Sequence, residues 1–143
     1  MKLKIGFDIT TCWDNKAFRE IMKQAVGDVE QIEMFIITTS DNTNMIKEAQ
    51  EYLGLDENHV VRCSSMALKI DSIQRLGVMI FVDVDMTSVI GINTLVPLKN
   101  AINNVTGCVA IHYNDSLLDV YDMQLKHYTL IQFWIGQISR NLN

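Results

Sequence analysis

Three observations predict an α/β fold in which a doubly wound, mostly parallel sheet is the middle of three layers. Short apolar runs recur along the sequence, and they are continuous rather than alternating, as is typical of strands buried on both faces. Segments with apolar residues at helical spacing separate these runs, which is the pattern of a parallel sheet joined by helices. The 143 residues contain no Gly/Ser-rich linker, so residues 1–143 are expected to form a single domain.

In the first part of the chain, two expected strands alternate with two expected helices. Residues 2–9 and 34–38 are apolar and β-branched, as buried strands are. The residues expected to face inward from the helices are Phe18, Ile21, Met22, Ala25 and Val26 in the first, and Met45, Ile46, Ala49 and Leu53 in the second. The expected N-caps are Asp14 for the first helix and Ser40 or Asp41 for the second, with Gly27 and Gly54 at their ends.

The same alternation continues to residue 83 and weakens beyond it. Residues 59–63 form the third expected strand, Ser64 or Ser65 caps a helix that stops at Gly77, and residues 78–82 form the most apolar strand. Further elements are expected at 92–98 (strand), 99–104 (short helix) and 108–113 (strand), although no single period assigns residues 99–143 well.

The apolar segment 128–138 is far shorter than the roughly 20 residues that cross a bilayer, and no signal peptide opens the chain, so no membrane contact is expected. Burial in the monomer is the simpler account of Tyr128, Phe133 and Trp134, and a contact within a homo-oligomer is the alternative.

Charge and cysteine content exclude several classes of function. The formal net charge is −5, with no basic stripe, so a broad nucleic-acid surface is not expected. Three cysteines at wide spacing are an odd number, which is typical of reduced thiols in the cytoplasm rather than of a disulfide framework.

Polar side chains follow three of the expected strands. Asp8, Thr38 and Asp83 stand at strand ends, and Lys69 lies in the first turn of the helix before the last of them. Because ligands bind at the carboxyl ends of parallel strands, these side chains are expected to surround one crevice. Such a set suits phosphoryl transfer: carboxylates hold Mg²⁺, one carboxylate attacks phosphorus, and the hydroxyl and ammonium hold the phosphate oxygens.

In order and spacing, these residues resemble the motifs of the haloacid dehalogenase (HAD) superfamily of phosphatases and phosphotransferases, which has a Rossmannoid fold. The resemblance covers about residues 2–98. It implies that Asp8 is the nucleophile and a Mg²⁺ ligand, that Thr38 and Lys69 bind phosphate, and that Asp83 is a Mg²⁺ ligand. Thr39 is the alternative register for Thr38. Asp85 is a candidate second acid, displaced by one position from the usual adjacent pair.

The chain departs from this family at Thr10, where its phosphatases usually carry a second Asp as general acid and base. The backbone carbonyl of Thr10 can still ligate Mg²⁺, but its hydroxyl is a poor proton donor and a poor base. The resemblance therefore implies slow hydrolysis, since the family's ion-pumping ATPases also have Thr at this position and keep a long-lived phosphoenzyme.

No cap insertion is evident after the first strand, so the expected site is open. An open site favours a large phosphorylated substrate, or a partner protein that covers it.

The alternative function is a HAD-like domain that has lost its chemistry and acts in binding or regulation. A receiver-like domain is a third candidate, which the single acid at the end of the first strand disfavours. Each residue also has an ordinary interpretation: Asp8 can cap a helix or bind a turn, and Asp83 and Asp85 can be solvated loop acids. Thr38, Thr39 and Ser40 can be helix caps, and Lys69 can be a surface lysine.

Overall fold

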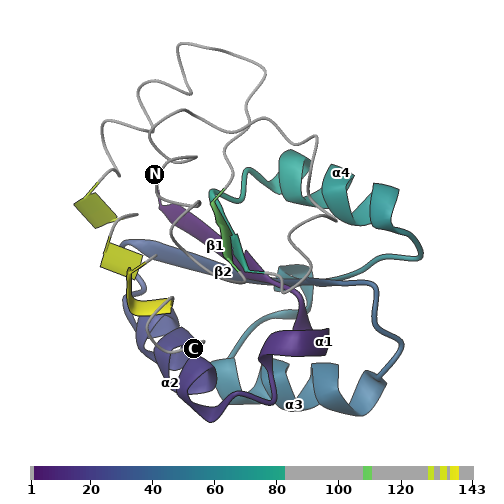
Figure 1. Cartoon of the computed structure of the whole chain (residues 1–143), viewed down its shortest axis with the longest axis horizontal. Coiled ribbons are helices and arrows are strands. Elements are labelled where there is room, and N and C mark those ends of the chain that lie inside the picture. The colour runs from purple at the N-terminus through teal and green to yellow at the C-terminus, as the bar shows by residue number, and fades with distance from the viewer. Residues whose placement is uncertain (1, 83–107, 111–128, 131–132, 135, 139–143) are drawn as a thin grey trace.

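The described part of the protein has an α/β fold built around a five-stranded sheet (Figure 1). The computed structural model describes residues 2–82, 108–110, 129–130, 133–134 and 136–138. The strands are β1 (Leu3–Phe7), β2 (Ile32–Thr38), β3 (Val60–Arg62), β4 (Ile80–Val82) and β5 (Cys108–Ala110). They lie in the order β3-β2-β1-β4-β5, in which the first four are parallel and β5 runs antiparallel to β4. The predicted α/β class, with a mostly parallel sheet, is confirmed.

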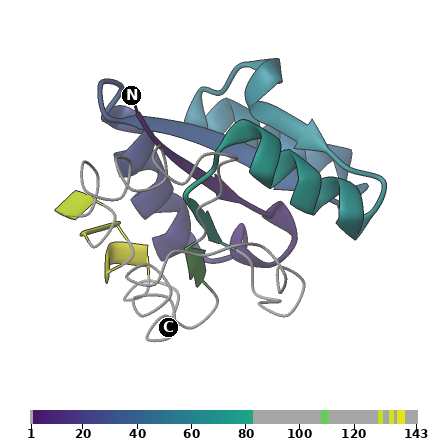
Figure 2. The same cartoon turned by 90° about the horizontal axis from the view of Figure 1, so that it is seen from above.

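Helices join the parallel strands. They are α1 (Ile9–Cys12), α2 (Lys16–Gly27), α3 (Thr43–Leu53) and α4 (Met66–Leu76), with a 3₁₀ turn η1 (Glu57–His59) before β3. α2 and α3 lie on one face of the sheet and α4 on the other (Figure 1). This division follows from the strand order, because right-handed crossovers to β2 and β3 run in one direction and the crossover back to β4 runs in the other. α4 packs against β2, as the view from above also shows (Figure 2).

The hydrophobic core lies on both faces of the two central strands, β1 and β2. Leu3, Ile5 and Phe7 of β1 are fully buried, and so are Ile36 and Ile37 of β2. The helix faces predicted from periodicity meet them: the buried residues are Phe18, Ile21, Met22 and Ala25 in α2 and Ile46, Ala49 and Leu53 in α3, while Val26 and Met45 are half-buried. A sheet covered on both faces explains why its strands are continuous apolar runs.

The first strand was predicted to cover residues 2–9, but it is shorter. β1 ends at Phe7, and Ile9 begins the one-turn helix α1. The turn starts here because the Asp8 side chain accepts a hydrogen bond from the amide of Thr10, as an N-cap does. The chain therefore changes direction at Asp8, and the end of the central strand carries this carboxylate.

Two predicted N-caps are wrong. Asn15, not Asp14, caps α2, and Asn42, rather than Ser40 or Asp41, caps α3. Each asparagine side chain accepts a hydrogen bond from the amide three residues later, at 3.0 and 3.1 Å respectively. An N-cap must place its side-chain oxygen over that amide, and among adjacent polar residues the backbone conformation decides which one does so.

The predicted helix ends agree better with the structure. Gly54 terminates α3 with a φ of 68°, a left-handed conformation that favours glycine, and Gly77 follows α4 with a φ of 71°. Ser65 accepts a hydrogen bond from the amide of Leu68 at 3.2 Å, as the predicted cap of α4 should. Gly27 is the last residue of α2 rather than the residue after it, and Asp28 is the C-cap.

The third and fourth strands are shorter than predicted, because η1 takes residues 57–59 and β4 begins at Ile80. The expected elements at 92–98 and 99–104 lie outside the described residues. Of the expected strand at 108–113, Cys108–Ala110 is described and forms β5. In the C-terminal segment, Trp134 and Ile138 are buried and Phe133 is exposed.

Candidate functional site

The candidate site is centred on Asp8, which links the neighbouring parallel strands β1 and β4. Asp8 follows β1, and its amide donates a hydrogen bond of 3.0 Å to the carbonyl of Val82, the last residue of β4. Its side chain is buried, since only 3% of the residue is exposed. A buried carboxylate is costly unless cations or hydrogen-bond donors surround it, so its partners determine what it can do.

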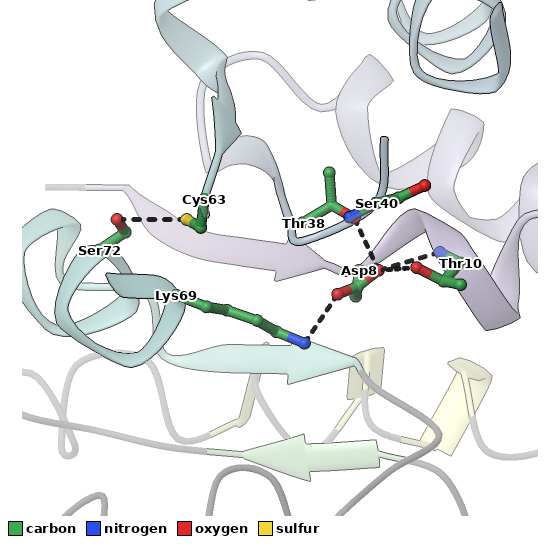
Figure 3. Close-up of polar contacts among 7 residues, drawn as sticks. All are labelled: Asp8, Thr10, Thr38, Ser40, Cys63, Lys69 and Ser72. Carbon is green, nitrogen blue, oxygen red and sulfur yellow. Dashed lines mark hydrogen bonds and ion pairs between the residues drawn. The ribbon is translucent and has the colours of Figure 1, made fainter. Parts of the chain in front are cut away.

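Four hydrogen bonds converge on the Asp8 carboxylate (Figure 3). Oδ1 accepts from the amide of Thr10 at 2.9 Å, from the Thr10 hydroxyl at 2.7 Å and from the Thr38 hydroxyl at 2.8 Å. Oδ2 accepts from the ammonium of Lys69 at 2.7 Å. Among the described residues, Oδ1 therefore has three donors, whereas Oδ2 has Lys69 as its donor and keeps a lone pair.

Thr38 ends β2 and is fully buried. Its hydroxyl oxygen accepts a hydrogen bond of 3.0 Å from the amide of Ser40 while its one proton is donated to Asp8. The Ser40 amide therefore fixes the direction in which Thr38 donates. Thr39, the alternative register in the sequence, is exposed.

Lys69 reaches the site from the first turn of α4, on the other face of the sheet. Only 2% of this lysine is exposed, and its Nζ lies 5.5 Å from the centre of the Phe81 ring in β4. The ring face attracts the cation, and the Asp8 carboxylate neutralises it. A lysine buried in this way is unlike the surface lysine that was the ordinary interpretation of the sequence.

The environment of Asp8 keeps its carboxyl group ionised. Burial acts to raise its pKa, but the hydrogen bonds from Lys69 and Thr10 and the positive charge of Lys69 outweigh burial, so the pKa lies below the usual range. The site therefore contains an ionised, oriented carboxylate beside an ammonium and a hydroxyl. Chemically, the carboxylate can act as a nucleophile, and the ammonium and hydroxyl can hold an anion.

The structure brings together Asp8, Thr10, Thr38 and Lys69, four of the residues singled out from the sequence. Asp83 and Asp85, the other expected Mg²⁺ ligands, lie outside the described residues. Within the described part of the chain, no three His, Cys, Asp or Glu side chains gather as metal ligands. Among the described atoms of the site, the Asp8 carboxylate and the Thr10 carbonyl are oxygens of the kind that could bind Mg²⁺.

Two contacts next to the site were not predicted from the sequence. The amide of Cys63 donates to the carbonyl of Thr38 at 2.8 Å, and the Cys63 thiol lies 3.7 Å from the hydroxyl of Ser72, one turn after Lys69 in α4. Both side chains are buried, so the residue after β3 contacts α4 beside Thr38 and Lys69 (Figure 3). The register of β2 and β3 predicts the first contact, but no sequence pattern signals the second.

The fold and site together define an α/β protein with a buried acid at the end of its central strand. Comparisons with protein-family models, with curated proteins and with solved structures found no match. In the part of the chain that the structure describes, none of the helices has the length and apolar character needed to span a bilayer.

Proposed function

We propose that this protein is a HAD-like, Mg²⁺-dependent phosphotransferase or slow phosphohydrolase that forms an aspartyl-phosphate on Asp8. One observation carries the proposal: the buried carboxylate at the end of β1 meets a hydroxyl from the end of β2 and an ammonium from α4. The resemblance to the HAD superfamily rests on the same three groups in the same order along the chain. A cytoplasmic location is part of the proposal, and the free, buried thiol of Cys63 is compatible with it.

The donors around Asp8 can change partners when a phosphoryl group arrives. Thr38 and Lys69 bind the carboxylate through side chains, so both can turn to phosphoryl oxygens, where charge develops during transfer. The Thr10 amide donates to Asp8, which is the N-cap of α1, and this hydrogen bond stays in place. Lys69 carries three donor protons, so it can bind the carboxylate and a phosphoryl oxygen together.

The residues present fit a Mg²⁺ ion, which prefers oxygen ligands and keeps several waters. Asp8 supplies an ionised carboxylate oxygen and Thr10 a backbone carbonyl, and the proposal adds Asp83 and Asp85. The hydrogen bond from the Asp8 amide to Val82 supports this addition, because Asp83 follows Val82 directly in the sequence. When bound, Mg²⁺ would neutralise phosphoryl charge and orient the group for attack.

A second candidate function is a HAD-like domain without catalysis that binds or regulates a partner protein. The observation that favours it is that four donors already bind Asp8, so that the carboxylate links β1, β2 and α4. In this alternative, a partner covers the open site and no phosphoryl group displaces Thr38 or Lys69.

Calorimetric titration distinguishes the two functions. Mg²⁺, and then Mg²⁺ with beryllium fluoride as a phosphoryl mimic, would be titrated into the wild type, Asp8→Asn and Asp14→Asn. Asp14 is an exposed acid outside the site, so its variant controls for the loss of one negative charge. Phosphoryl transfer predicts Mg²⁺-dependent fluoride binding that Asp8→Asn abolishes and Asp14→Asn retains. Absence of binding to the wild type would contradict the catalytic function and leave the binding protein.

A further inference from the structure

The geometry of Thr10 points to the class of phosphoryl donor. We infer that the site accepts donors whose leaving group departs as a stable anion, acyl phosphates above all, and not alkyl phosphates. This inference rests on the proposed function, since it concerns the group that leaves when Asp8 attacks. It follows from the hydrogen bond between the Thr10 hydroxyl and the Asp8 carboxylate.

The Thr10 hydroxyl is committed to Asp8. Its oxygen lies 2.7 Å from Asp8 Oδ1, and the amide of the same residue lies 2.9 Å from that oxygen. A hydroxyl has one proton to donate, and here the acceptor is a buried, ionised carboxylate, which makes a strong charge-assisted hydrogen bond. Thr10 therefore acts as a positioning residue for Asp8 and has no proton to give to a departing oxygen.

The other described groups of the site do not supply that proton either. Asp8 is ionised and is itself the nucleophile. Lys69 compensates the buried charge of Asp8 at 2.7 Å, and loss of its proton would leave the carboxylate and the incoming phosphoryl group without a cation. Thr38 donates its proton to Asp8 and, in the proposed function, to a phosphoryl oxygen.

With the described groups alone, the transfer step proceeds without a proton for the leaving group. A lone pair on Asp8 Oδ2, which accepts from Lys69 while Oδ1 holds three donors, forms the new bond to phosphorus. The bond from phosphorus to the leaving oxygen breaks, and its electron pair stays on that oxygen. A carboxylate leaving group is stable as the anion, whereas an alkoxide must be protonated as it departs. Transfer from an acyl phosphate also yields another acyl phosphate, so the exchange is close to balanced in free energy.

A series of leaving groups tests the inference. The wild type with Mg²⁺ would be mixed with acetyl phosphate, phenyl phosphate or ethyl phosphate, and hydroxylamine-sensitive phosphoenzyme would be measured over time. We expect labelling by acetyl phosphate, slower labelling by phenyl phosphate and none by ethyl phosphate. Asp14→Asn, which changes an exposed acid outside the site, should keep this profile. Thr10→Asp should raise the rate with ethyl phosphate by about 10²–10⁴-fold, the usual contribution of a general acid, and change the acetyl phosphate rate far less.

Each contrary outcome has its own meaning. Labelling by ethyl phosphate at a rate similar to acetyl phosphate would overturn the inference and leave the proposed function intact. An equal effect of Thr10→Asp on both donors would overturn it as well. If no donor labels a protein that still binds Mg²⁺ and beryllium fluoride through Asp8, the inference fails alone. If that binding is also absent, the proposed function fails. The wild-type series needs no variant, so a misfolded Thr10→Asp protein does not remove the test.

Discussion

Lys69 and Asp8 are 61 residues apart in the sequence and form a buried ion pair with 2.7 Å between Nζ and Oδ2. The pair joins α4 to the end of the central strand across the edge of the sheet. Removing two charges from water is costly, and the mutual attraction of the pair offsets that cost only while both partners are present. The pair is thus a point at which stability and the proposed chemistry depend on the same atoms.

The first prediction concerns loss of one partner. Lys69→Met should lower the free energy of unfolding by about 3–5 kcal/mol, because it leaves a buried carboxylate without its cation. The double variant Asp8→Asn/Lys69→Met should be less destabilised than the sum of the two single variants. Urea denaturation of the four proteins provides the cycle.

An exposed pair supplies the control for this cycle. Arg75 and Asp71 lie 3.9 Å apart with more than half of each side chain exposed. Arg75→Met should therefore lower the free energy of unfolding by less than about 1 kcal/mol. Strict additivity of the two site variants would show that Asp8 and Lys69 do not interact in the folded protein.

The second prediction concerns acid. The pKa of Asp8 is lower in the folded protein than in the unfolded chain, so the unfolded state binds more protons as the pH falls through this range. The stability that Asp8 contributes should be complete above its unfolded pKa and be lost as the pH falls through its folded pKa. Urea denaturation between neutral and strongly acidic pH should show a steeper loss for the wild type than for Asp8→Asn/Lys69→Met. Parallel pH profiles would contradict this assignment.

The third prediction concerns the hydroxyl of Thr38. Thr38→Val keeps the shape of a fully buried side chain but removes the donor to Asp8 and the acceptor of the Ser40 amide. We expect a loss of about 1–3 kcal/mol in the free energy of unfolding, together with a rise in the pKa of Asp8. Carboxyl carbon chemical shifts as a function of pH would measure that pKa. Thr38→Ser, which keeps the hydroxyl, should restore the wild-type value, and an unchanged pKa in Thr38→Val would refute the hydrogen bond.

Much of this fold follows from the sequence because its strands are buried on both faces. Continuous apolar runs and helical spacing predicted β1 to β4 and α2 to α4, with Gly54 and Gly77 at two helix ends. The helix α1 could not be predicted, because four residues are too few to show a period and Ile9 extends the apolar run of β1. The choice of Asn15 over Asp14 as N-cap depends on backbone angles that adjacent polar residues do not reveal.

The sequence predicted that Asp8, Thr38 and Lys69 lie close together, but it did not predict which hydrogen bonds join the residues of the site. Parallel strand ends placed Asp8 near Thr38, and the first turn of α4 placed Lys69 beside them. The sequence offered no means of learning that Thr10 donates both its amide and its hydroxyl to one oxygen of Asp8, since that arrangement depends on a side-chain rotamer. The roles of Asp83 and Asp85 stay predictions.

The fourth prediction concerns the close packing of β1. A Cβ atom at Gly6 would lie 3.2 Å from Cδ2 of Phe81 and 3.3 Å from Cγ1 of Val78, so both side chains would have to shift. Gly6→Ala should therefore destabilise the fold by about 1–3 kcal/mol, as overpacking does. Gly27→Ala is the matched control, because a Cβ there meets nothing within 4 Å. Thermal denaturation would compare them, and equal midpoints would show that the core around Gly6 yields easily.

The strand order has a consequence for how the chain folds during synthesis. β1 leaves the ribosome first, yet one of its two neighbours, β4, is complete only after residue 82. Until then the central strand has a free edge, and Asp8 lacks the carbonyl that receives its amide, although its cation Lys69 is already part of the chain. Pairings so distant in sequence close late and slowly. Assembly of the acidic site therefore coincides with closure of the sheet, and a nascent chain shorter than this has neither.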